Sequence, residues 1–128
     1  MYPKDYRYSK EHEWVKVDGS TATLGITDHA QKELGDVVFL ELAEVGRKLE
    51  PGQILGTVES VKAVSEIYCP VHGEIIERNT ALIDHPEELN QDPHGKAWMV
   101  KLKLAPGADT SALMDASAYE AFAATSQH

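Results

Sequence analysis

A series of short apolar segments separated by turn signals most constrains how this chain can fold. Residues 13–17 alternate polar and apolar side chains and stop at Asp18-Gly19, a dipeptide typical of hairpin turns. Similar strand-forming segments occupy residues 21–26, 37–42, 54–58, 64–68, 74–78 and 97–104. In the last segment, the alternation predicts that Trp98, Val100, Leu102 and Leu104 share one face. Short strands and frequent glycines are typical of β-sandwiches and barrels, so the chain is predicted to be mainly β.

Two parts of the chain depart from the strand pattern. Thr27-Asp28 with Gln31 has the form of a helix cap, and Gly35 stands where a C-terminal glycine belongs, which predicts a short helix over residues 28–34. Residues 79–95 are loop-rich, with one helical turn expected at 86–89. The alanine-rich tail from Asp109 predicts one or two short helices within residues 109–124.

A weak internal repeat bears on the architecture. Gly35-Asp-Val-Val in the first half of the repeat recurs as Gly73-Glu-Ile-Ile in the second. Later in each half, Gly52-Gln-Ile-Leu of the first corresponds to Gly95-Lys-Ala-Trp of the second. Two similar strand-turn-strand halves favour a flattened β-sandwich or barrel with pseudo-twofold symmetry. At 128 residues, we expect a single domain over 1–128, with its core at about 8–105 and a helical segment at about 109–124.

Charge and chain composition exclude several classes of protein. Twelve basic and twenty-one acidic residues give a net charge of −9, which repels nucleic-acid backbones and anionic lipid heads, and no basic patch offsets it. No segment is long and apolar enough to span a bilayer, and the N-terminus has no features of a signal or transit peptide. We therefore expect a cytoplasmic protein of bacterial type, with a processed organellar protein as the alternative, and no nucleic-acid or membrane partner.

The six histidines and the single cysteine form no recognisable metal or catalytic motif. The sequence has no HExxH, no paired cysteine spacing, no phosphate loop and no nucleophile elbow. Cys69-Pro-Val-His72 is only half of a possible metal site, and Cys69 is better explained as a small apolar side chain at a strand end. The sequence therefore predicts neither a metal site nor a catalytic residue.

Lys62 is distinguished by its setting. It lies in a break of about four residues between two apolar strands, the spacing of a tight hairpin connection, within Glu59-Ser60-Val61-Lys62-Ala63. An exposed lysine at a rigid turn can enter the site of a modifying enzyme, and its acylation leaves a long, mobile arm. A stiff platform with such a swinging arm raises the effective concentration of a cargo at each partner. The alternative is an ordinary solvated turn lysine.

The segment around Lys62 resembles the lipoylation turn of glycine cleavage system H proteins. The resemblance extends from about residue 8 to residue 122, nearly the whole chain. Its blocks, in order, are His12-Glu-Trp14, Gly25-Ile-Thr-Asp28, Ala30-Gln31, Leu34-Gly-Asp-Val-Val-Phe39, Glu59-Ser-Val-Lys-Ala63, Ser65-Glu-Ile-Tyr68, Pro70 with Gly73-Glu74, Asn90 with Asp92-Pro93, and Trp98.

The resemblance implies a lipoyl/biotinyl-type flattened β-sandwich (a barrel-sandwich hybrid) with short helices at 28–34 and in the C-terminal tail. It also implies a carrier that is not an enzyme, with lipoic acid attached covalently to Lys62 as lipoamide. In glycine catabolism the arm takes an aminomethyl group from glycine decarboxylase (P protein) to the aminomethyltransferase (T protein), which feeds one-carbon metabolism. Dihydrolipoyl dehydrogenase (L protein) reoxidises the arm, and a lipoate ligase or lipoyl/octanoyl transferase attaches it. A carrier with several partners favours a monomer.

The resemblance further implies that the loaded arm is sheltered in a surface cleft near the N-terminal motif. The acidic positions that match are Glu13, Glu66 and Glu11, whose carboxylates we expect to hold the protonated amine by charge-assisted hydrogen bonds. The alternative is that all three are solvated acids at strand ends. The chain departs from the usual family pattern at His94, Lys96-Ala97, Cys69 and Glu66, none of which lies in the modified turn.

Three other functions remain open at this stage. A biotin carrier or the lipoyl domain of a 2-oxoacid dehydrogenase acyltransferase also presents a turn lysine, but Val61 and Ala63 replace the methionines that flank a biotinyl lysine. An H-like lipoyl donor in a lipoate relay would use the same lysine. An unmodified β-sandwich would only bind partners.

Overall fold

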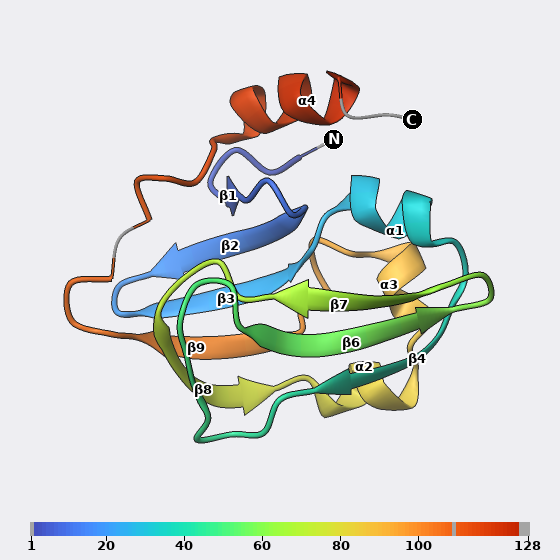
Figure 1. The fold of residues 1–128 in the computed structure, drawn as a ribbon, viewed down its shortest axis with the longest axis horizontal. Helices are drawn as coiled ribbons and strands as arrows, with labels where there is room; N and C mark the ends of the chain where they lie inside the picture. The colour runs from blue at the N-terminus through green and yellow to red at the C-terminus, as the bar shows by residue number, and fades with distance from the viewer. Residues whose placement is uncertain (1, 109, 126–128) are drawn as a thin grey trace.

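Two antiparallel β-sheets face each other in the computed structural model, which describes residues 2–108 and 110–125 (Figure 1). The larger sheet contains, in spatial order, β1 (Arg7–Tyr8), β2 (Glu13–Asp18), β3 (Thr21–Ile26), β9 (Val100–Leu104), β8 (Gly73–Arg78) and β5 (Lys48–Leu49). The smaller sheet contains β4 (Val37–Leu42), β6 (Ile54–Ser60) and β7 (Val64–Tyr68). The described helices are α1 (Asp28–Leu34), α2 (Thr80–Asp84), α3 (Glu88–Gln91) and α4 (Ala116–Thr125). The predicted mainly β sandwich with short helices is confirmed.

The two halves of the internal repeat lie in opposite sheets. β4, which follows Gly35, pairs with β6 in the smaller sheet, and β8, which begins at Gly73, pairs with β9 in the larger sheet. The sequence segments that begin at Gly52 and Gly95 lead into β6 and β9 respectively. The repeat therefore corresponds to two facing strand pairs, as a pseudo-twofold sandwich requires.

The main core fills the space between the sheets. It consists of aliphatic side chains from both inner faces, including Val15, Leu24, Leu40, Val58, Ile75 and Leu102. A second, aromatic cluster lies where α4 covers the N-terminal strands, and it contains Tyr8, Trp14 and Tyr119, all buried. The rings of Tyr8 and Tyr119 stack at 4.8 Å, so α4 is attached to β1 by aromatic contact.

The Trp14 side chain leaves room only for glycine at its partner position on β3. Its indole Nε1–H donates to the carbonyl of Pro93 at 2.8 Å, and its strand partner is Gly25. A Cβ atom at Gly25 would lie 2.7 Å from Nε1 of Trp14, closer than packed atoms approach. The block Gly25-Ile-Thr-Asp28 therefore begins with glycine because the Trp14 ring occupies the space of a side chain.

Local signals predicted α1 correctly, and tertiary packing changed other elements. The hydroxyl of Thr27 caps α1 by accepting from the N–H of Ala30 at 3.2 Å, and Gly35 ends the helix at a φ of 81°. By contrast, α2 occupies part of a predicted loop, and the two-residue strands β1 and β5 were not predicted because two residues carry no periodicity. The described tail contains a single helix, α4; Asp109, where the predicted tail segment begins, lies outside the described residues.

The prediction that Trp98 shares a face with the strand residues after it is wrong. β9 begins only at Val100, and Val100 and Leu102 lie in the main core, with Leu104 packed against it. Trp98 instead packs against the aromatic cluster. Because residues 97–99 are not part of the pleated strand, the two-residue alternation does not extend to Trp98.

No helix among the described residues is long and apolar enough to cross a membrane.

The side chain of Asn90 ties three separate segments together. Its Oδ1 accepts from the N–H of Val37 at 2.8 Å, and its Nδ2 donates to the carbonyl of Gly35 at 2.8 Å and to Oε1 of Gln31 at 3.0 Å. These bonds satisfy backbone groups where α1 ends and β4 begins, a place where neither a helix nor a sheet supplies partners. Asn90 therefore determines how the α1–β4 connection lies against α3.

Replacing Asn90 by Ala is expected to lower the free energy of unfolding by about 2–3 kcal/mol, because three hydrogen bonds are lost and the N–H of Val37 is left without its partner. Urea denaturation measures the change. Gln91→Ala, at the exposed next position of α3, is the control and should change stability by less than about 0.5 kcal/mol. Equal, small losses in the two variants would contradict this role for Asn90.

Candidate functional site

Lys62 lies at the exposed connection between β6 and β7, which projects from one end of the smaller sheet (Figure 1). Ser60, buried at the base of this turn, organises its backbone. The Ser60 hydroxyl accepts from the N–H groups of Lys62 at 3.3 Å and Ala63 at 3.1 Å, and the Ser60 N–H donates to the carbonyl of Ala63 at 2.8 Å. A serine at this position thus fixes the turn through its side chain while the lysine faces outward.

A second contact connects the lysine turn to the α1–β4 connection. The N–H of Val61 donates to the carbonyl of Asp36 at 3.0 Å. A Cβ at Gly35 would come within 3.4 Å of Cε of Lys62, so the lysine side chain passes close to this glycine. Because Asn90 holds the residues on both sides of Asp36, its hydrogen bonds also define where the lysine turn lies.

Apolar side chains are exposed around the turn. Val61 and Val64 flank Lys62 and are 69% and 66% exposed, and Val38 and Phe39 on the adjoining strand β4 are about half exposed. Exposed apolar residues grouped at one place are typical of surfaces that contact other proteins. Lys62 therefore lies within an exposed apolar surface.

A groove of about 680 Å³ begins beside the lysine turn and is called here the α1–β7 groove. Three carboxylates face it, from Glu11, Glu33 and Glu66, together with the imidazole of His12. It is lined by Glu11, His12, Ile26, Ala30, Glu33, Leu34 and residues 63–68. Its apolar floor and acidic walls suit an extended apolar chain that ends in a cation.

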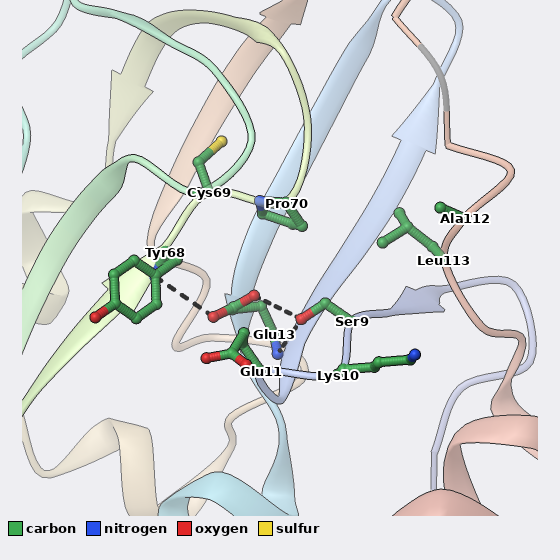
Figure 2. Close-up of a pocket in the computed structure, with 10 residues that line it drawn as sticks. Ser9, Lys10, Glu11, Glu13, Tyr68, Cys69, Pro70, Ala112 and Leu113 are labelled. Carbon is green, nitrogen blue, oxygen red and sulfur yellow. Dashed lines mark hydrogen bonds between the residues drawn. The ribbon is translucent and has the colours of Figure 1, made fainter.

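Glu13 lies in a different cavity, of about 540 Å³, which shares Glu11 and Tyr68 with the groove (Figure 2). Its side chain is only 2% exposed. Oε1 accepts from the Ser9 hydroxyl at 2.5 Å, and Oε2 accepts from the N–H of Tyr68 at 3.4 Å. Burial raises the pKa of Glu13 to about 7, against the opposite effect of these two hydrogen bonds.

The structure places the three acidic residues that the sequence grouped together in two adjoining cavities. Glu66 lines the α1–β7 groove, Glu13 is buried in the second cavity and bonded to the N–H of Tyr68, and Glu11 lines both. Glu33 and His12 also line the groove, and neither was predicted to do so from the sequence. Glu33 lies one turn after His29 on α1, an i,i+4 spacing that places both on one helix face, and this was the available signal.

Cys69 has the structural role that was expected. It is buried, its thiol donates to the carbonyl of Val71 at 3.0 Å, and burial raises its pKa to about 11. A thiol that stays protonated at neutral pH is a poor nucleophile.

A family model described as "Glycine cleavage H-protein" matches residues 6–126. The chain is 52% identical over 121 residues to the glycine cleavage system H protein of Acidobacterium capsulatum, with 94% of this chain and 93% of that protein covered. It is 53% identical over 120 residues to that of Symbiobacterium thermophilum, with 94% of each covered. A crystal structure of a glycine cleavage system H protein from Mycobacterium marinum superimposes with a TM-score of 0.85 at 36% identity, covering 94% of this chain and 97% of that one.

The raised pKa of Glu13 gives stability a pH dependence with a defined sign. The folded protein binds this proton more tightly than the unfolded chain, so the stabilising effect is complete below pH 4.5 and is lost as the pH rises through about 7. Between pH 4.5 and 8, the wild type should lose about 1–3 kcal/mol of unfolding free energy relative to Glu13→Gln, which cannot ionise.

Urea denaturation of both proteins at the two pH values measures this difference. Glu44→Gln, which removes an exposed carboxylate elsewhere, should follow the wild type. A constant difference between wild type and Glu13→Gln over the range would show that Glu13 does not titrate as described.

Proposed function

This chain belongs to the glycine cleavage H-protein family, and we propose that Lys62 is the residue that bears its lipoyl group. H proteins carry covalent lipoyl-lysine and have no catalytic activity of their own, so the chain is a lipoyl carrier of the glycine cleavage system and acts with the other components of that system. The observation that carries the assignment of Lys62 is its exposure at a turn whose backbone is held by Ser60 and by the bond from Val61 to Asp36.

The partners that we propose follow from the chemistry of such an arm. Glycine decarboxylase loads the aminomethyl group, the aminomethyltransferase removes it, and dihydrolipoyl dehydrogenase reoxidises the dithiol. A lipoate ligase or a lipoyl/octanoyl transferase attaches the group. The exposed side chains of Val38, Phe39, Val61 and Val64 provide an apolar surface that each enzyme can contact while the arm enters its site. We propose that the chain visits them as a monomer formed by a single lipoyl-carrier domain.

We also propose that the loaded arm lies along the α1–β7 groove. The groove begins at Ala63 and Val64, next to Lys62, and it extends along β7 to Glu66 and Glu11. An aminomethylated arm ends in a protonated amine, which these two carboxylates attract and hold by charge-assisted hydrogen bonds. Glu13, bonded to the backbone of Tyr68, keeps in place the wall between the groove and the second cavity. Its role is to position Tyr68 rather than to contact the amine directly.

Lys62→Arg is expected to abolish both lipoylation and carrier activity, because a guanidinium does not form the lipoyl amide. Intact mass after incubation with a lipoylating enzyme, and glycine-dependent bicarbonate exchange with glycine decarboxylase, measure the two effects. The matched control is Lys48→Arg, an exposed lysine on β5 in the larger sheet, which should keep the modification and the exchange. Exchange that persists in Lys62→Arg would refute the assignment of the lipoyl site.

The double variant Glu11→Gln/Glu66→Gln is expected to lose the aminomethyl group by hydrolysis, which releases formaldehyde and ammonia, roughly 5- to 30-fold faster. Each exposed charge-assisted hydrogen bond contributes about 0.5–1 kcal/mol, so two contribute about 1–2 kcal/mol. The decay of the loaded form, followed by mass spectrometry, gives the rate. Glu44→Gln, a carboxylate away from the groove, should decay as the wild type does. If all three proteins decay at one rate, the two carboxylates do not hold the arm.

A further inference from the structure

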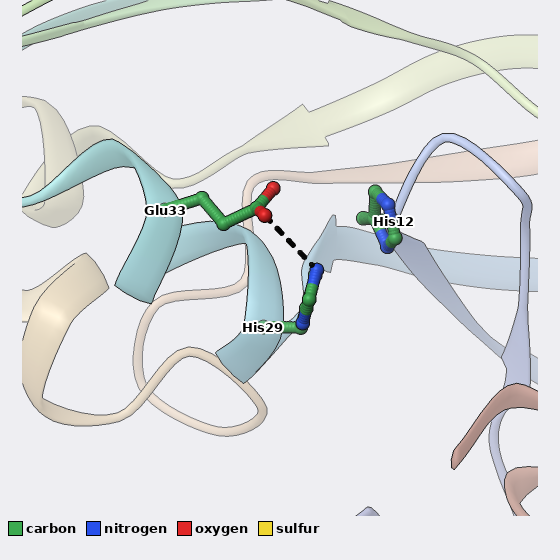
Figure 3. Close-up of side chains that lie close together, drawn as sticks. All are labelled: His12, His29 and Glu33. Carbon is green, nitrogen blue, oxygen red and sulfur yellow. Dashed lines mark ion pairs between the residues drawn. The ribbon is translucent and has the colours of Figure 1, made fainter. Parts of the chain in front are cut away.

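His12, His29 and Glu33 lie close together (Figure 3), and His12 and Glu33 also line the α1–β7 groove. His29 and Glu33 come from successive turns of α1, and His12 comes from the turn that precedes β2. One potential ligand atom from each lies within 4.8 Å of the other two. We propose that these three side chains form a binding site for a divalent transition-metal ion of the zinc type, and the proposal does not depend on the lipoyl group.

The separation of two donors already fits a shared ion. Nε2 of His29 and a carboxylate oxygen of Glu33 are 3.4 Å apart. Ligands about 2.0–2.1 Å from a tetrahedral zinc ion lie roughly 3.3 Å from one another. The contact is long for a hydrogen bond, and Nε2 of His29 is buried without a hydrogen-bond partner among the described residues. A buried nitrogen in that state requires an explanation, and an ion placed between it and Glu33 supplies one.

The third donor, His12, is held by its backbone and by its second ring nitrogen. His12 has a φ of 68°, a left-handed conformation that is uncommon for a residue with a side chain, and its N–H and C=O are bonded to Ser9 and Thr27. Nδ1 lies 2.7 Å from the hydroxyl of Tyr119, which lies 2.7 Å from Oγ1 of Thr27.

This chain of hydrogen bonds can orient His12 for an ion. When Nδ1–H donates to Tyr119 and the tyrosine hydroxyl donates to Thr27, the lone pair of Nε2 is left for the ion. Metal-binding histidines are commonly oriented by such an outer partner. Burial and the neighbouring His29 both lower the pKa of His12, which favours the neutral imidazole that a metal requires.

The three side chains would leave one coordination position of the ion open to water. Two imidazoles and one carboxylate bind zinc in many proteins and leave a fourth position for water. Because His12 and Glu33 also line the α1–β7 groove, water can reach that position from the groove. The donor atoms lie within 4.8 Å of one another, so an ion must draw the side chains closer together, and Glu33, whose side chain is 52% exposed, has room to rotate. The bound ion would join α1 to the turn before β2.

The chain contains a matched pair that lacks the third donor. Nδ1 of His85 lies 3.5 Å from a carboxylate oxygen of Glu87, nearly the separation found in the proposed site, but both side chains are mostly exposed. No third histidine, cysteine or carboxylate groups with this pair among the described residues. His85→Gln is therefore the control for the loss of one imidazole.

The test is titration of the full, unmodified chain with Zn²⁺ and Co²⁺. One ion should bind per chain, Co²⁺ should show the intense visible absorption of tetrahedral coordination, and Zn²⁺ should raise the Tm. His29→Gln and Glu33→Gln should each weaken Zn²⁺ binding at least about ten-fold, and Tyr119→Phe, which removes only the outer hydroxyl, about ten-fold. His85→Gln should bind as the wild type does.

Glu33→Gln keeps the test decisive if His29→Gln fails to fold, because Glu33 is half exposed and its substitution leaves the core intact. Circular dichroism without metal verifies the fold of each variant. The proposal is overturned if wild type and Glu33→Gln bind Zn²⁺ equally, or if His85→Gln loses the same site.

Discussion

The amide of Asn90 is the constraint on which the presentation of the lysine depends. It satisfies backbone groups of Gly35 and Val37, on either side of Asp36, and the carbonyl of Asp36 in turn accepts from Val61 in the lysine turn. A side chain from α3 therefore determines where the hairpin tip of the smaller sheet lies relative to α1. Since a glycine of positive φ stands at this junction, no regular element supplies these hydrogen bonds, and one amide replaces them.

In the lysine turn, the backbone is held in place while the lysine side chain can move. Ser60 and the bond to Asp36 hold the backbone of the turn, while Lys62 is exposed beside two exposed valines. A carrier works through this division, because a fixed base limits the volume that a tethered group explores and so raises its effective concentration at a partner. The α1–β7 groove lies next to the turn and offers acidic walls along the length of β7.

The acidic residues around this groove differ in how deeply they are buried. Glu11 and Glu66 are exposed and carry the negative potential, whereas Glu13 is buried and has a pKa near neutrality. Hydrogen bonds from the Ser9 hydroxyl and from the N–H of Tyr68 hold the Glu13 carboxylate within the fold. The histidines also differ in burial: His12 lies against the second, aromatic core, where it contacts the hydroxyl of Tyr119, and His29 packs on His12, while His85 lies at the surface.

The sequence by itself determined the elements whose causes are local. The cap at Thr27, the hairpin at Asp18-Gly19 and the turn that presents Lys62 each depend on residues a few positions apart, and each was predicted. Only the tertiary structure decided which distant groups meet. Three such contacts join segments from different sheets and helices: those of Asn90 with the α1–β4 connection, that of Glu13 with the N–H of Tyr68, and that of His12 with His29 and Glu33. The physical reason is that short-range hydrogen bonding and periodicity select local conformations, whereas the pKa of a carboxylate or the convergence of three ligands depends on packing and desolvation across the fold.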